Sequence, residues 1–192
     1  MSLSYALLSI LNILPMTGYD LKHQAFDQTV RYYWPADQSQ IYRTLKRLTE
    51  KGMLTATVED SDQGPDRKVY HVTEKGRQAL ADWQRTDEQP PTIRDPFLIQ
   101  MSFGSELTND ELHSLIAHQL EVHRAQLAEY QAIPIPPREA FPQNRWLALQ
   151  HLTLDLGRRI ERAYVEWLQM CLDADLPAPE GQEPRLLDNP DN

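Results

Sequence analysis

Three side chains that can hydrogen-bond to DNA bases recur at helical spacing within residues 36–54, ADQSQIYRTLKRLTEKGML. Gln40, Arg43 and Arg47 are three and four residues apart, so a helix would carry them together on one face. Arg can form two hydrogen bonds with guanine, through O6 and N7, and Gln can form two with adenine. The spacing therefore predicts a helix face that contacts bases in the major groove.

Short polar residues precede these three and a further cation borders them. Gln38 and Ser39 would lie at the helix N-terminus, where free backbone N–H groups and the helix dipole favour a phosphate. Lys46 borders the same face. The alternative is an ordinary solvated basic face, in which Arg47 pairs with Glu50. The flanking elements favour DNA contact.

The ends of this helix are marked by residues that start and stop helices. Asp37 is a suitable N-cap, and Gln40 three residues later completes a capping-box pattern. Gly52 provides the stop at the other end. One apolar stripe, on a different side from the polar residues, is expected to be buried: Ile41, Leu45 and Leu48.

The neighbouring segments predict a winged helix-turn-helix. Two helices are expected before the central one, over residues 2–14 and 18–30, with Thr17 capping the second. Segments 54–59 and 67–73 alternate as strands and predict a β-hairpin, and Thr73 then caps another helix. In this order of elements the third helix enters the major groove and the hairpin forms the wing.

The expected wing carries charges of both signs. Arg67 and Lys68 are placed to contact the DNA backbone or the minor groove. Asp60, Asp62 and Asp66 lie in or beside the same turn and would repel phosphate. If the wing touches DNA, we expect Arg67 and Lys68 to make the contact.

The second half of the chain predicts a helical domain that pairs two copies of the protein. A short apolar helix is expected near residues 93–106, a helix capped by Thr108 and Glu111 follows, and the last helix spans roughly 143–174. The last helix repeats apolar residues in steps of three and four, as a coiled-coil seam does. The predicted dimerisation residues are Trp146, Leu149, Leu156, Ile160, Tyr164 and Trp167. The alternative is that Trp146, Tyr164 and Trp167 line a pocket for an aromatic or apolar effector.

Charge is distributed unevenly between the two halves. The chain of 192 residues has a net charge of −9. Residues 1–89 carry a net charge of only −1, and the remaining residues carry −8. Because a local patch and not the total charge sets phosphate attraction, the acidic total does not exclude DNA binding.

The sequence favours neither an enzyme nor a metal protein. No glycine-rich phosphate loop, nucleophile elbow or paired-carboxylate motif is found, so we expect no catalytic residues and no cofactor. His113, His118 and His123 are five residues apart and would point to different sides of a helix, which argues against a metal site. The lone Cys171, and the absence of an apolar run long enough to cross a bilayer, predict a cytoplasmic protein without a membrane partner.

Several ordered motifs resemble the PadR family of transcriptional regulators. The matching segments are YALLSIL…PMTGYDLK, WPADQSQIYRTLKRLTEKGML and GPDRKVYHVTEKGRQAL, which cover about residues 3–85. Tyr42 matches the family's recognition-helix tyrosine, and the resemblance implies that it contacts DNA. RDPFLIQMSFG and the two long helices resemble the C-terminal domain of the family's virulence-activator-like branch.

The resemblance implies a homodimeric regulator that binds a palindromic operator in double-stranded DNA, often a repressor released by a small-molecule effector. The expected fold is mainly α with a small β-hairpin: an N-terminal winged helix-turn-helix and a C-terminal α-helical dimerisation domain. The expected divisions are residues 1–86 for DNA binding, 87–93 as linker, 94–176 for dimerisation and 177–192 as an acidic tail. The alternative function is a protein-interaction adaptor that keeps the fold without specific DNA binding.

Overall fold

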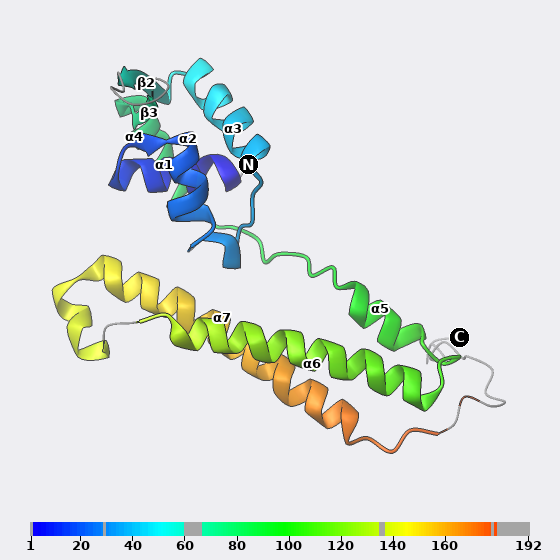
Figure 1. Cartoon of the computed structure of the whole chain (residues 1–192). Coiled ribbons are helices and arrows are strands. Elements are labelled where there is room, and N and C mark those ends of the chain that lie inside the picture. Colours follow the sequence, from blue (N-terminus) through cyan, green and yellow to red (C-terminus); the bar gives the residue numbers. More distant parts are fainter. Residues whose placement is uncertain (1, 29, 60–66, 135–136, 178, 180–192) are drawn as a thin grey trace, which may run out of the picture. The chain divides into compact units, whose positions relative to one another are not determined.

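The computed structural model (Figure 1) describes residues 2–28, 30–59, 67–134, 137–177 and 179. The chain forms two compact units, residues 1–91 and 92–192. The acidic wing turn, with Asp60, Asp62 and Asp66, and nearly all of the predicted tail lie outside the described residues.

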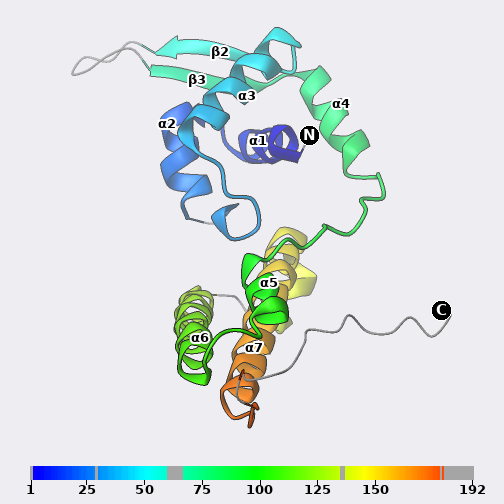
Figure 2. The same ribbon diagram turned by 90° about the vertical axis from the view of Figure 1, so that its right-hand side faces the viewer.

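The described residues of the first unit form six helical segments and a small sheet. Its elements are α1 (Ser2–Ile13), β1 (Met16–Thr17), α2 (Gly18–Asp20), the π-helical η1 (Leu21–Phe26), the 3-10 turn η2 (Val30–Tyr32), α3 (Gln38–Glu50), β2 (Leu54–Glu59), β3 (Arg67–Val72) and α4 (Glu74–Trp83). Figure 2 shows α1 at the centre of the unit, with α2, α3, α4 and the hairpin around it. The predicted winged helix-turn-helix is therefore confirmed.

The core of the first unit joins α1 to every element that surrounds it. Its fully buried members include Leu7 and Leu8 of α1, Leu21 and Phe26 of η1, and the stripe of α3. The stripe is the predicted one with Thr44 added: Ile41, Thr44, Leu45 and Leu48. Burial of this one side fixes how α3 is rotated, and therefore which residues face outward.

The sheet has one strand more than the sequence predicted. Strand order is β1-β3-β2, all antiparallel, and Thr17 of β1 lies opposite Val69 of β3. In the hairpin, Leu54 pairs with Val72 and Glu59 with Arg67. In the sequence, the segment around Met16 and Thr17 has the pattern of a break between helices, because two residues are too few to show strand alternation.

The second unit is a helical hairpin with a short helix beside it. Its elements are α5 (Pro96–Phe103), α6 (Asn109–Ala132), the 3-10 segment η3 (Arg138–Gln143) and α7 (Arg145–Leu172). Figures 1 and 2 both show α6 and α7 side by side. Phe97, Ile116, Leu120 and Leu168 form its buried core. Arg158 of α7 donates hydrogen bonds to the carbonyl oxygens of Tyr130, Gln131 and Ile133, and so caps the C-terminal end of α6.

The predicted helix caps are present. Thr17, Asp37, Thr73 and Thr108 each accept a hydrogen bond from the backbone N–H three residues later. Gly52, after α3, has a φ of 69°, a conformation that favours glycine. Within the described ranges, no helix is long and apolar enough to cross a membrane.

Candidate nucleic-acid interface

A capping box holds the N-terminus of α3. The carboxylate Oδ1 of Asp37 accepts from the Gln40 backbone N–H at 2.7 Å, and Gln40 Oε1 accepts from the Asp37 N–H at 3.1 Å. The Gln40 carboxamide oxygen is thus engaged, while its NH₂ group can still donate. Gln40 could form two hydrogen bonds with adenine. The one that uses its carboxamide oxygen would compete with the capping bond from the Asp37 N–H.

All seven predicted contact residues of α3 are exposed: Gln38, Ser39, Gln40, Tyr42, Arg43, Lys46 and Arg47. At about 100° per residue, Ser39, Arg43 and Lys46 project directly away from the buried stripe. We call the side of α3 that carries these three residues the outward face. Gln40 and Arg47 lie at one edge of it, closer to Thr44. The outward face is therefore centred on Arg43, and Gln40 and Arg47, which were predicted to share the centre with it, lie to one side.

Arg43 and Arg47 differ in their hydrogen-bond partners. Arg47 Nη2 donates to Ser4 Oγ of α1 at 2.8 Å. Among the described residues, Arg43 has no hydrogen-bond or ion-pair partner. Glu50 pairs loosely with Lys46, at 3.9 Å, and not with Arg47 as the alternative in the sequence analysis supposed. Arg43 is thus the guanidinium that can bind a ligand without giving up a protein partner.

Two aromatic side chains that the sequence analysis did not select lie beside this face. Tyr33 and Trp34 border an open hollow together with Gln40, Arg43 and Arg47. Both aromatic side chains are exposed although they are large and apolar. The Trp-Pro dipeptide before α3 marks this segment in the sequence, but residue spacing does not indicate that these rings remain uncovered.

Tyr42 lies over the start of α2. A Cβ atom placed on Gly18 would come within 2.6 Å of Tyr42 Cε1, so only glycine allows this approach. The ring nevertheless remains 42% exposed. Tyr42 therefore links the two helices of the helix-turn-helix and still offers one side to a ligand.

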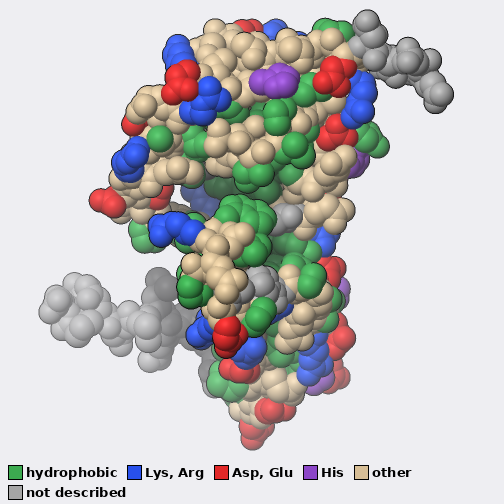
Figure 3. Space-filling view, turned by 90° about the vertical axis from the view of Figure 1, so that its left-hand side faces the viewer, with side chains coloured by type: hydrophobic (Ala, Val, Ile, Leu, Met, Phe, Trp, Pro, Cys, Tyr) green, Lys and Arg blue, Asp and Glu red, His purple; other side chains and the backbone are tan. Residues whose placement is uncertain are grey.

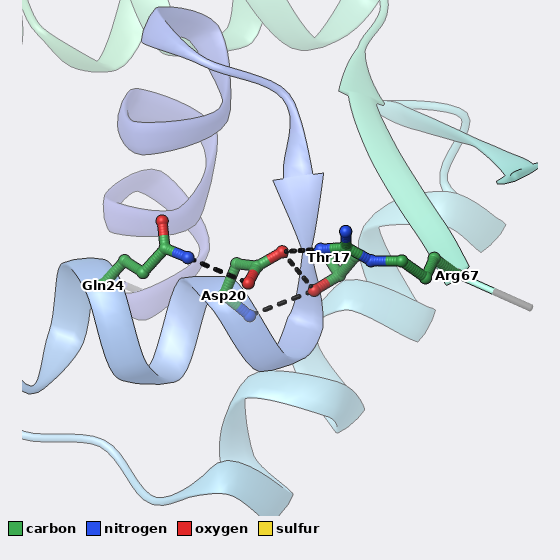
Figure 4. Close-up of polar contacts among 4 residues, drawn as sticks. All are labelled: Thr17, Asp20, Gln24 and Arg67. Carbon is green, nitrogen blue, oxygen red and sulfur yellow. Dashed lines mark hydrogen bonds and ion pairs between the residues drawn. The ribbon is translucent and has the colours of Figure 1, made fainter. Parts of the chain in front are cut away.

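The first cation of the wing is paired with an acidic residue of α2. Arg67 Nη2 donates to Asp20 Oδ2 at 2.8 Å. Asp20 also accepts from Thr17 Oγ1 at 2.8 Å and from Gln24 Nε2 at 3.0 Å (Figure 4). Arg67 is a predicted DNA contact, but its partner Asp20 is 47 residues away and has no signal in the sequence.

The second cation of the wing has a different neighbour. Lys68 Nζ lies 5.6 Å from the centre of the Tyr70 ring, within cation–π range. Burial raises the pKa of Tyr70, so its phenol stays neutral at physiological pH. No acidic partner of Lys68 lies among the described residues, so its ammonium group can bind an anion without breaking an ion pair.

Both signs of charge share the surface in Figure 3, where Lys and Arg side chains lie beside Asp and Glu side chains. The positive charge of the candidate interface itself comes from a few exposed groups, Arg43, Lys46, Arg47 and Lys68.

The six predicted dimerisation residues of α7 fall into two groups. Trp146, Leu149, Leu156 and Ile160 are about half exposed and form one stripe along the helix. Tyr164 and Trp167 instead pack within the second unit. The Trp167 ring meets Phe97 of α5 edge to face, and Tyr164 donates to Asp95, the N-cap of α5, at 3.2 Å.

The histidines of α6 do not converge. His123 stacks on Tyr164 and forms a 2.6 Å hydrogen bond with Glu161. In the described part of the chain, no three His, Cys, Asp or Glu residues are grouped as a metal site would require.

Two family models match the chain. Residues 7–82 match the model described as "Transcriptional regulator PadR-like family", and residues 93–174 match "Virulence activator alpha C-term". A curated relative from Bacillus subtilis, "Negative transcriptional regulator PadR", is 31% identical over 178 residues, which is 88% of this chain and 95% of the relative.

Solved structures of similar proteins cover the whole fold. The structure of Bacillus subtilis PadR in complex with operator DNA has a TM-score of 0.76 and 29% identity, and covers 90% of this chain and 98% of that one. Bacillus subtilis PadR in complex with p-coumaric acid has a TM-score of 0.70 at the same identity and coverage.

Proposed function

This chain belongs to the PadR-like family of transcriptional regulators, and on that premise we propose that it is a homodimeric repressor that binds a palindromic operator in double-stranded DNA. Residues 1–86 would bind DNA, 87–93 link, and 94–176 dimerise. Transcriptional regulators are not a class of enzymes, and we propose that this protein is cytoplasmic and has no catalytic activity.

The observation that carries the proposal is the outward face of α3. A capped helix that buries one apolar stripe presents Ser39, Arg43 and Lys46 away from the core. Arg43 has no protein partner among the described residues to compete with a base. In a winged helix this helix enters the major groove, and Gln38, Ser39, Tyr42, Lys46 and Arg47 would surround Arg43 there, with Lys68 on the backbone.

The stripe on α7 supports the proposed dimer. Leu149, Leu156 and Ile160 are 50%, 58% and 47% exposed, which is costly for large apolar residues that recur on one side of a helix. A second copy of the chain would cover them, and a two-fold dimer presents two α3 helices to two half-sites.

The complexes of the Bacillus subtilis relative support two further parts of the proposal. That protein is called a negative regulator, which supports repression here, and it has been crystallised with p-coumaric acid. We therefore include a small-molecule effector that changes operator affinity.

Titration of two arginine variants tests the assignment of α3. Arg43→Ala should weaken binding to a DNA fragment from the chain's own promoter by about 1–3 kcal/mol and relax base preference. Arg47→Ala should cost less, because its guanidinium is shared with Ser4. Fluorescence anisotropy with the promoter fragment, and with a random duplex of equal length, measures both effects.

Arg85→Ala is the matched control, since it removes the same charge from an exposed position just after α4. It should leave the ratio of promoter to random affinity unchanged. If the wild type bound the promoter fragment and the random duplex with equal affinity, the adaptor function would be favoured instead. If the Arg43→Ala protein kept the wild-type ratio of promoter to random affinity, Arg43 would not belong to the interface.

A further inference from the structure

The ion pair at the base of the wing has a geometry that suits a structural tether. Arg67 is the first residue of β3, directly after the wing turn, and Asp20 is the last residue of α2. Figure 4 shows their side chains pointing toward each other from these two elements. Thr17 and Gln24 hold the carboxylate from two further directions.

We propose that Asp20 and Arg67 are positioning residues that set the angle of the wing relative to the recognition helix, and that Arg67 is not a phosphate contact. This inference rests on the proposed DNA-binding function. It assigns the cation contact of the wing to Lys68 alone among the described residues of the hairpin.

Burial makes the pair difficult to break. The Asp20 side chain is 14% exposed, whereas that of Arg67 is 57% exposed. If Arg67 moved to a phosphate, the carboxylate would stay in this enclosed position without its cation, which is unfavourable. The paired guanidinium also carries little net charge toward a phosphate, because Asp20 neutralises it at 2.8 Å.

The pair also completes a chain of contacts between wing and recognition helix. Thr17 pairs with Val69 in the sheet and caps α2, so β3 is attached to α2 at two points, Val69 and Arg67. The ring of Tyr42 in α3 lies against Gly18 at the start of the same helix. The orientation of α2 is thus transmitted to both DNA-facing elements.

The two roles of Arg67 predict opposite effects for Asp20→Ala. If the pair positions the wing, Asp20→Ala and Arg67→Ala should each weaken binding to the promoter fragment, by about fivefold, and the double variant should be no weaker than either. If Arg67 contacted phosphate, Asp20→Ala would free a cation and strengthen binding. Arg67→Ala would also lower the slope of log affinity against log salt by about one per protomer.

Glu121→Ala is the charge-matched control, since it removes one exposed carboxylate of α6 that pairs with Arg124 at 3.0 Å. It should leave both promoter affinity and salt slope unchanged. Tighter binding by Asp20→Ala than by this control, or a changed salt slope in Arg67→Ala, would overturn the proposal.

Hydrogen exchange without DNA tests the tether separately from the proposed function. Amides of β2 and β3 should exchange faster in Asp20→Ala and Arg67→Ala, while those of α6 and α7 keep their wild-type rates. Wild-type exchange throughout both variants would overturn the tether. Failure of the wild type to prefer its promoter over a random duplex would overturn the proposed function but leave this measurement valid.

Discussion

The helices α3 and α7 are both amphipathic, but they differ in what they leave exposed. On α3 one apolar stripe is buried and the rest of the surface is polar or carries Tyr42. On α7 one side packs on α6, and a second apolar stripe, centred on Leu149, Leu156 and Ile160, remains exposed. The apolar stripe of α3 is thus buried within its own unit, whereas α7 keeps a second apolar stripe that its unit does not cover.

This difference separates two kinds of partner. A polar outward face, with a guanidinium that has no partner within the described ranges, favours an anionic, hydrogen-bonding ligand, and its contribution depends on salt. An exposed apolar stripe favours burial against another protein, and its contribution depends on area. Charge changes should therefore affect α3 most, and changes of hydrophobic contact should affect α7 most.

The largest effect is expected from a charge placed in the exposed stripe of α7. Leu156→Glu should abolish the dimer, because a carboxylate would be buried without a partner at the proposed seam. Operator affinity should then fall by about two orders of magnitude or more, since the second half-site loses its tethered α3. Sedimentation at micromolar protein and anisotropy with the promoter fragment measure the two effects.

Arg162→Glu serves as the control on the same helix. Arg162 is exposed on the polar side of α7, away from both apolar sides, so its variant should remain dimeric. A Leu156→Glu protein that sediments as a dimer would refute the assignment of the stripe as the seam.

A smaller effect is expected from the two capping boxes, one in each unit. Asp37→Ala and Thr108→Ala should each cost roughly 1 kcal/mol of stability in the unit that contains the cap. Hydrogen exchange should show the loss in α3 for the first variant and in α6 for the second. Only Asp37→Ala should also reduce operator affinity, because loss of the Asp37 carboxylate loosens the first turn of α3, which carries Gln38, Ser39 and Gln40; equal losses of affinity in both would contradict the division of roles.

The smallest effect is a pH dependence that arises at the α6 box. Hydrogen bonds from the Thr108 backbone N–H and hydroxyl lower the pKa of Glu111 from its ordinary value of 4.5. A lowered folded-state pKa means that the stabilisation is complete above the unfolded-state pKa and is lost as pH falls through the folded value. The difference in Tm between wild type and Glu111→Gln should therefore shrink below about pH 4.5. If the difference in Tm between the two proteins grew as the pH fell, the prediction would be wrong.

Much of the first unit could be predicted because its signals are local. Asp37 with Gln40, Thr73 and Gly52 mark helix ends within a few residues, and the hairpin alternates along its own strands. The predicted fold class is confirmed for that reason. β1 was not predicted because its two residues have no alternating pattern and form a strand only by pairing with β3.

The site was less predictable where partners are distant in sequence. Arg47 with Ser4, and Arg67 with Asp20, are pairs that residue spacing cannot reveal. Along α7, the period of three and four included Tyr164 and Trp167 with the exposed residues, although α5 covers them. A repeat shows that residues are apolar at helical spacing, but it does not say which neighbour each one meets.

The contact of Gly18 with Tyr42 has a consequence for how this sequence can diverge. Because a Cβ at position 18 would come within 2.6 Å of the tyrosine ring, a larger residue there requires the exposed ring to turn away or to be replaced by a smaller side chain. Either change alters the surface of α3. Evolution of a new operator preference through position 42 would therefore also release position 18, and the two sites should co-vary among related chains.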